Sequence, residues 1–133
     1  MTTRAEAFAG LSVAITTPFR GDKVDYDRLA EQVEFQIAAG TRCICPAGTT
    51  GESPTLSHDE HDELIAQTVK IAAGRIKVMA GTGSNSTAEA LRLTRHAEKA
   101  GVDAVLLVTP YYNKPTQEGF YQHYKALPEA TSL

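Results

Sequence analysis

Ala104-Val105-Leu106-Leu107-Val108 is an unbroken run of aliphatic residues, and it is the segment of this chain that points most directly to a fold class. A strand with one solvated face alternates apolar and polar side chains, and this run does not alternate. Continuous apolar runs of this length are typical of parallel strands that are covered on both faces. The run therefore predicts a buried strand in a parallel sheet.

Three earlier apolar runs, at residues 11–15, 43–45 and 76–80, have the same surroundings. Each is followed by a loop rich in Gly, Pro or Thr and then by a longer helical pattern, and the runs begin roughly thirty residues apart. Four consecutive βα units predict an α/β fold with a parallel sheet. The sheet is either small and open or the first half of a TIM (β/α)8 barrel, which needs about 250 residues. No linker is visible, so residues 1–133 are interpreted as one domain.

Local signals place the four helices between and after these runs. Asp25 can cap a helix that ends near Gly40, and the fourth helix is expected to start near Thr116 and to stop before Pro128. Two capping-box patterns predict the other helices, which should end at glycines in the left-handed conformation. These are Ser57 and Glu60 with Gly74, and Ser86 and Glu89 with Gly101.

Composition excludes several classes of partner. A net charge of −3 gives no basis for binding nucleic acid or an anionic membrane, and no apolar run is long enough to span a bilayer. Cys43 and Cys45 lie two apart in a predicted strand, where a disulfide between them is unlikely on geometric grounds. We therefore expect a protein of the reducing cytoplasm.

Ligands of parallel α/β folds bind at the carboxyl ends of the strands, so the loops there are the candidate sites. The Gly48-Thr49-Thr50-Gly51-Glu52 loop offers backbone N–H groups and two hydroxyls, which suit a carboxylate or phosphate or merely satisfy a tight turn. Gly81-Thr82-Gly83 resembles a dinucleotide loop, but Ser86 stands where a third glycine is required. A strand-to-helix turn is the favoured interpretation of that segment.

Two other segments contain residue types that often take part in catalysis. His58 and His61 are three apart, whereas zinc proteases use two histidines four apart, and acidic residues surround this pair. We therefore predict a solvated helix start and no metal site. Tyr111-Tyr112 follows the last apolar run, where a phenol can relay a proton or pack at a subunit contact. Both roles remain open for these tyrosines.

Four of these segments, taken together, resemble the dihydrodipicolinate synthase family, in the superfamily that includes N-acetylneuraminate lyase. The resemblance runs from about Leu11 to the last residue. It implies a TIM-barrel lyase, without cofactor, that condenses pyruvate with aspartate semialdehyde through a Schiff base in lysine and diaminopimelate biosynthesis. It also implies a cytoplasmic homo-oligomer, a dimer or tetramer. The matching segments are Gly48 to Glu52, His58 to His61, Ala80 to Gly83 and Val108 to Pro115.

The resemblance also assigns roles to single residues. Thr50 is expected to hold the pyruvate carboxylate, and Thr49 and Tyr112 to belong to the proton relay, with Tyr112 reaching into a neighbouring subunit's site. Some members are inhibited by lysine at a dimer interface, and Pro54 here replaces an alanine found in some of them. The positions that match this effector site are Ser53, Pro54, His58, His61, Asn85, Glu89 and Tyr111.

The same resemblance implies that the Schiff-base lysine, at the end of the sixth barrel strand, is absent from these 133 residues. Lys77 begins a predicted strand, at the end away from barrel chemistry, and the other lysines fall in predicted loops or helices. We therefore expect the chain alone to be inactive. Three interpretations follow: part of a synthase, a non-catalytic half-barrel that assembles through its open first and fourth strands, or part of a sister aldolase such as N-acetylneuraminate lyase.

Overall fold

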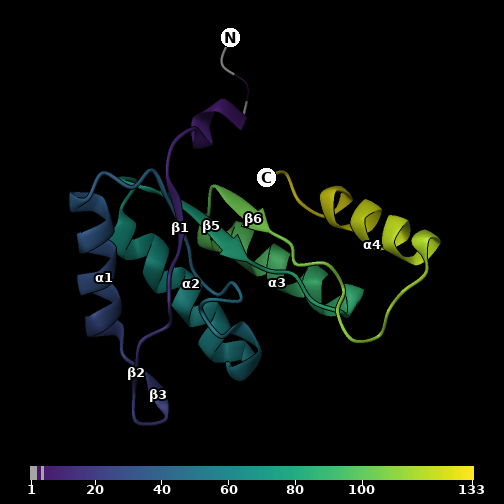
Figure 1. Cartoon of the computed structure of the whole chain (residues 1–133), viewed down its shortest axis with the longest axis horizontal. Coiled ribbons are helices and arrows are strands. Elements are labelled where there is room, and N and C mark those ends of the chain that lie inside the picture. The colour runs from purple at the N-terminus through teal and green to yellow at the C-terminus, as the bar shows by residue number, and fades with distance from the viewer. Residues whose placement is uncertain (1–2, 4) are drawn as a thin grey trace.

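A computed structural model describes residue 3 and residues 5–133 of the chain, and its elements follow the predicted βα order (Figure 1). Four strands form one parallel sheet in the order β1-β4-β5-β6, so β1 and β6 are the outer strands, as predicted. The predicted alternation of strands and helices is confirmed. The sheet consists of β1 (Ser12–Ala14), β4 (Cys43–Cys45), β5 (Lys77–Gly81) and β6 (Ala104–Leu106).

Each strand of the sheet is followed by a helix, and successive helices pack side by side. Figure 1 shows the first three alongside the sheet, whereas the fourth extends beyond β6 and packs on the third. None of the described helices is both long enough and apolar enough to cross a membrane. The helices are α1 (Tyr26–Ala38), α2 (His58–Ala72), α3 (Thr87–Ala100) and α4 (Gln117–Glu129).

Small elements that the sequence analysis did not predict occupy the connections. A short antiparallel hairpin, β2 (Phe19–Arg20) with β3 (Lys23–Val24), turns through Gly21 at φ 67° between β1 and α1. Two 3₁₀ helices, η1 (Ala5–Phe8) and η2 (Ser53–Thr55), precede β1 and α2. The second of these lies in the loop after β4 and helps to shape the site described below.

The N-terminal ends of the helices mostly follow the predicted chemistry. Asp25 caps α1 by accepting from Arg28 N, and Ser57 and Glu60 form a complete capping box on α2. The second predicted capping box is wrong in one half. Ser86 accepts from Glu89 N, but the Glu89 carboxylate binds Ser84 and His58 rather than the backbone of residue 86. A tertiary contact therefore replaces the local one.

The C-terminal ends agree less closely with the prediction. Gly101 caps α3 at φ 91°, as expected, and Ala73 at φ 47° ends α2 one residue before Gly74. The prediction that α4 stops before Pro128 is wrong, because the helix continues to Glu129. Proline here lies in the last turn, where its missing N–H removes a single hydrogen bond next to the helix end.

The core lies between the sheet and the first three helices. Strand β4 is buried throughout, and its two cysteines are free, as predicted. Burial raises the pKa of the Cys45 thiol to about 11, so it is protonated at neutral pH. The largest fully buried apolar side chains of this layer are Leu29, Val33, Ile44, Leu64, Ile65 and Val78.

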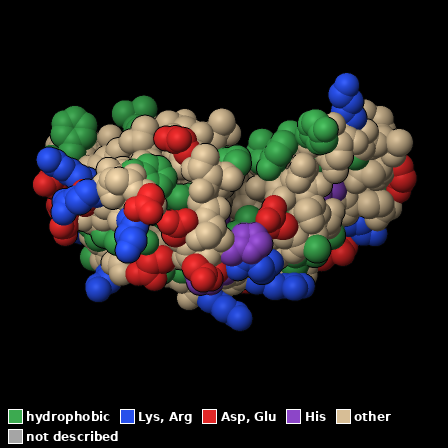
Figure 2. Space-filling model, turned by 90° about the horizontal axis from the view of Figure 1, so that it is seen from below, with side chains coloured by type: hydrophobic (Ala, Val, Ile, Leu, Met, Phe, Trp, Pro, Cys, Tyr) green, Lys and Arg blue, Asp and Glu red, His purple; other side chains and the backbone are tan. Residues whose placement is uncertain are grey.

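Strand β6 does not have the buried environment that its apolar run predicts. Leu106, the last residue of β6, is 48% exposed, and Val108, two residues beyond it, is 42% exposed. Among the described residues, β6 is an outer strand with one strand partner, β5. The run has the composition of a strand covered on both faces, but the described residues leave part of it uncovered. Seen from below relative to Figure 1, the surface carries both acidic and basic side chains, and neither sign forms a large patch on this face (Figure 2).

Candidate functional site

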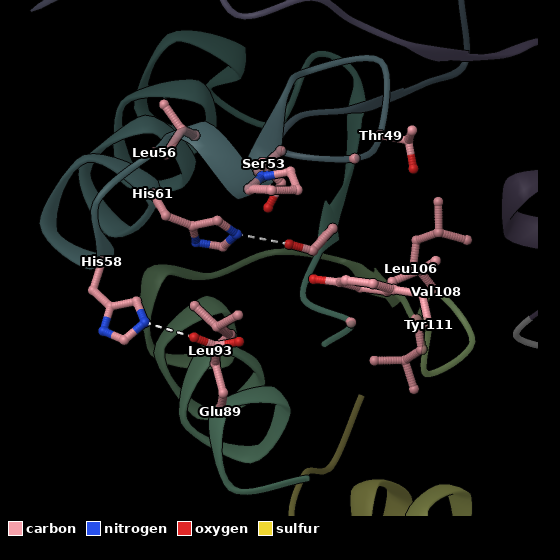
Figure 3. Close-up of a pocket in the computed structure, with 16 residues that line it drawn as sticks. Thr49, Ser53, Leu56, His58, His61, Glu89, Leu93, Leu106, Val108 and Tyr111 are labelled. Atoms are coloured by element: carbon pink, nitrogen blue, oxygen red, sulfur yellow. Dashed lines mark hydrogen bonds and ion pairs between the residues drawn. The ribbon is translucent and has the colours of Figure 1, made fainter. Parts of the chain in front are cut away.

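A cavity of about 700 Å³ opens at the carboxyl ends of β4, β5 and β6. Figure 3 shows its walls: the loop after β4, the first turns of α2 and α3, and the segment after β6. Its position is the one in which parallel α/β folds bind ligands. The side chains labelled there are Thr49, Ser53, Leu56, His58, His61, Glu89, Leu93, Leu106, Val108 and Tyr111.

The loop after β4 is a compact turn that carries the two threonines. Gly51 N donates to Gly48 O at 3.0 Å, and Glu52 N donates to Thr49 O at 3.1 Å. Glu52 adopts the left-handed conformation at φ 55°, which reverses the chain into η2. The side chains of Thr49 and Thr50 are exposed, and that of Thr49 lines the cavity. The loop is therefore a tight turn whose hydroxyls remain accessible, and its binding of a carboxylate or phosphate stays a prediction.

The glycines of the next loop serve close backbone packing. A Cβ on Gly81 would overlap the carbonyl of Ala47, and one on Gly83 would overlap the backbone N of Val108. Three neighbouring loops thus pack main chain against main chain. The segment connects β5 to α3, as the favoured interpretation of a strand-to-helix turn predicts.

Glu89 receives hydrogen bonds from two elements at one end of the cavity. His58 Nε2 lies 2.8 Å from one carboxylate oxygen, and Ser84 Oγ donates to the other through a short hydrogen bond. These bonds, that of Ser84 first, hold the pKa of Glu89 below its usual range. An ionised Glu89 therefore places a negative charge at this end of the cavity.

His61 is the buried histidine of the pair and faces the same cavity from α2. Its side chain is 4% exposed, and its Nε2 donates to the carbonyl oxygen of Gly81 at 2.9 Å. Burial lowers the pKa of His61, so the imidazole is neutral at pH 7. The described residues contain no group of three or more His, Cys, Asp or Glu side chains placed to hold a metal ion.

The two tyrosines after β6 point to different surroundings. Tyr111 lines the cavity from the segment after β6 (Figure 3). Its backbone carbonyl accepts from Asn85 Nδ2 at 3.2 Å. Asn113 Nδ2 donates in return to Asn85 O at 3.0 Å, so the two loops are joined twice. Tyr112 has a φ of 69° and is 93% exposed, and it does not line the cavity.

The structure thus brings together most of the residues that the resemblance groups. The cavity lining includes Thr49 and six of the seven effector positions, and the seventh, Asn85, binds the backbone of Tyr111. Thr50 and Tyr112 do not belong to the lining. Ser84 was missed, because its role depends on a contact with Glu89 that no local pattern encodes.

Comparisons with known proteins agree on one family. The model of the dihydrodipicolinate synthetase family matches residues 7–133. The 4-hydroxy-tetrahydrodipicolinate synthase of Pelagibacter ubique is 61% identical over 126 residues, which make up 95% of this chain and 43% of that protein. That of Syntrophus aciditrophicus is 58% identical over the same lengths.

Solved structures give the same result. A dihydrodipicolinate synthase from Aquifex aeolicus superposes with a TM-score of 0.92 at 52% identity, over 93% of this chain and 42% of that one. The synthase of Cyanidioschyzon merolae, solved with lysine bound, has a TM-score of 0.90 at 41% identity, over 94% of this chain and 43% of that one. The chain spans less than half the length of these relatives, so its four βα units correspond to half of their barrel. This chain belongs to the dihydrodipicolinate synthetase family.

Proposed function

We propose that the chain supplies the pyruvate-binding part of a 4-hydroxy-tetrahydrodipicolinate synthase. The reaction would be the Schiff-base condensation of pyruvate with aspartate semialdehyde, on the route to diaminopimelate and lysine. The observation that carries the proposal is the exposed Thr49-Thr50 turn, held at the carboxyl end of β4 at the edge of the cavity, in a chain of this family. The same comparisons favour a synthase over a sister aldolase such as N-acetylneuraminate lyase.

Thr50 would bind the pyruvate carboxylate through its hydroxyl and backbone, and Thr49 would pass a proton onward to a Tyr112 supplied by a second subunit. Exposure supports this assignment, because both threonines keep accessible hydroxyls. Tyr112 is turned outward by its left-handed backbone and is 93% exposed. It would therefore complete the relay in a second subunit's site within a cytoplasmic homo-oligomer, a dimer or tetramer.

The amine that attacks pyruvate would come from a lysine other than the six in these 133 residues. None of the six lines the cavity. Lys77 lies at the opposite end of β5, where its Nζ is 2.6 Å from Asp103 Oδ1. A Schiff-base lysine must reach the substrate to attack it, and Lys77 lies at the end of its strand away from the cavity. We therefore expect the 133-residue polypeptide to be inactive by itself.

The end of the cavity formed by α2 and α3 would bind lysine as an effector. Its polar groups include the ionised Glu89, which can attract an ammonium group, and the neutral ring of His61. The Cyanidioschyzon merolae relative was solved with lysine bound. Isothermal titration with L-lysine, using D-lysine as the control ligand, would test this part of the proposal.

Borohydride trapping with pyruvate tests the proposed reaction. The protein expressed from its complete reading frame should gain one covalent pyruvate adduct by intact mass, and the isolated 133-residue polypeptide should gain none. Turnover should require aspartate semialdehyde and should not occur with N-acetylneuraminate. A full-length protein that gives no adduct would contradict the proposal, and turnover of N-acetylneuraminate would favour the sister aldolase.

A second candidate function is a non-catalytic module that assembles as a half-barrel. The open outer strands β1 and β6 and the exposed Leu106 and Val108 favour it, because uncovered strand edges and apolar faces promote association. Two copies would pair β6 of each with β1 of the other. Sedimentation of the 133-residue polypeptide as a monomer at all working concentrations would exclude this module.

A further inference from the structure

Thr17 connects the end of the first strand to the threonine-bearing loop after β4. Its Oγ1 donates to the backbone carbonyl of Gly51 at 2.6 Å, across 34 positions of sequence. Thr17 is only 5% exposed, and it does not belong to the cavity lining. The hydroxyl therefore contacts the loop at a buried position outside the cavity lining, where a ligand in the cavity does not reach it.

The other hydrogen bonds of this loop fix its internal shape. Gly51 N and Glu52 N bind carbonyls within the same turn, those of Gly48 and Thr49. Such bonds keep the turn compact, but they do not set its position relative to the neighbouring strand. The bond from Thr17 does so, because it joins the turn to the residues that directly follow β1.

Gly51 packs too closely against these residues to shift toward them. A Cβ on Gly51 would lie 3.2 Å from both Ile15 O and Thr17 Oγ1. Thr50 is covalently joined to Gly51, so any movement of the Gly51 carbonyl displaces the Thr50 backbone and hydroxyl. Without the hydroxyl of residue 17, this buried carbonyl would lose its donor, and the loop would move to recover one.

We infer that Thr17 is a positioning residue for pyruvate, acting through the Gly51 carbonyl on Thr50. The inference rests on the proposed function, because it requires Thr50 to hold the pyruvate carboxylate. A displacement of about 1 Å in a group that orients a substrate lowers efficiency by up to about a hundredfold. Loss of the Thr17 hydrogen bond is therefore expected to raise KM for pyruvate in a protein that still folds.

Thr17→Val removes the hydroxyl and keeps the size of the side chain, and Thr17→Ser keeps the hydroxyl. Thr68→Val is the matched control, because Thr68 is fully buried and its Oγ1 donates to Leu64 O at 2.7 Å within α2. All variants are made in the protein expressed from its complete reading frame. The readouts are the melting temperature, and KM and kcat for pyruvate at saturating aspartate semialdehyde.

We expect Thr17→Val to raise KM for pyruvate about tenfold and Thr17→Ser to change it less than twofold. Thr68→Val should lower the melting temperature about as much as Thr17→Val does, and it should leave KM for pyruvate unchanged. If Thr17→Val does not fold, Thr17→Ala takes its place with the same expectation.

Equal KM values for Thr17→Val and wild type, or an equal rise in Thr68→Val, would overturn the inference while the wild type remains active. A wild-type protein that neither traps nor turns over pyruvate would overturn the proposed function, and the inference with it. The two failures are therefore distinguishable.

Discussion

His58 Nε2 lies 2.8 Å from Glu89 Oε1, so the first turn of α2 is joined to the first turn of α3 at one end of the cavity. The second carboxylate oxygen of Glu89 is held by Ser84. Two donors from different elements therefore stabilise one anion, and their hydrogen bonds replace the capping box that Glu89 would otherwise form with the backbone of Ser86. Its electrostatic consequences can be measured.

Glu89→Gln should destabilise the fold at pH 7 by about 1 kcal/mol, since it weakens two hydrogen bonds to a partly exposed carboxylate. Because the folded pKa of Glu89 is lowered, its stabilisation is fully present above the unfolded value of 4.5 and is lost as pH falls through the folded value. Urea unfolding of wild type and variant should therefore show a difference that shrinks below pH 4.5. A difference independent of pH would contradict this.

Burial of neutral His61 should make the fold sensitive to mild acid. Its folded pKa is lowered from 6.5, so the unfolded chain binds the proton more readily, and stability is lost as pH falls from 6.5 toward the folded value. An NMR titration should place the folded pKa of His61 below 6.5. The stability of His61→Gln should depend less on pH over this range. A folded value at or above 6.5 would refute the assignment.

Gly81→Ala should destabilise the protein by about 1–3 kcal/mol, because its Cβ would overlap the Ala47 carbonyl, and backbone cannot move aside cheaply. Gly48→Ala is the matched control, since its Cβ would meet only Cys45 Sγ, at 3.6 Å, an ordinary contact. Thermal unfolding of the two variants makes the comparison. Equal melting temperatures would show that the loops are not packed as described.

Asp103 should contribute more to stability than its ion-pair partner. Its Oδ2 accepts from Val78 N at 2.9 Å, and its Oδ1 pairs with Lys77 at 2.6 Å. Asp103→Ala leaves a β5 amide without its acceptor and should cost about 1–3 kcal/mol, whereas Lys77→Met removes a partly exposed pair and should cost less than about 1 kcal/mol. Urea denaturation measures both. A larger loss for Lys77→Met would reverse the ranking.

Leu106→Lys should reduce association of the 133-residue polypeptide, because it places a charge on the uncovered face of β6. Phe35→Lys, on the outer surface of α1, replaces a side chain that is 68% exposed and serves as the control. Sedimentation velocity should show a lower average mass for the first variant only. The same shift in both would mean that added charge, not the β6 face, controls association.

Much of the fold could be predicted because its signals are local. Asp25 and Ser57 begin helices through hydrogen bonds to residues three positions ahead, and the apolar runs coincide with the strands. Glu89 was predicted less well, because Ser84 and His58 compete successfully for its carboxylate, and that competition exists only in the folded chain. The exposure of Leu106 has the same origin: composition records the environment for which a strand is suited, not which neighbours are present.

The candidate site divides in the same way. Its residues could be grouped by their resemblance to a family, but the bond from Thr17 to Gly51 joins segments 34 residues apart and leaves no local pattern. The resemblance gives Tyr111 and Tyr112 different roles, but no local pattern shows that Tyr111 faces the cavity and Tyr112 faces outward. That difference depends on the left-handed backbone of Tyr112.

The contacts of Gly81 with Ala47 and of Gly83 with Val108 mean that part of the cavity wall is main chain. Backbone amide and carbonyl groups are the same in every amino acid except proline, so that part keeps its chemistry when neighbouring side chains are replaced. Ligand preference then depends on the few side chains mounted above it. For protein engineering, the main-chain part of the lining stays constant and the side chains can be exchanged. Thr49, Ser53 and Tyr111 are the first positions to randomise.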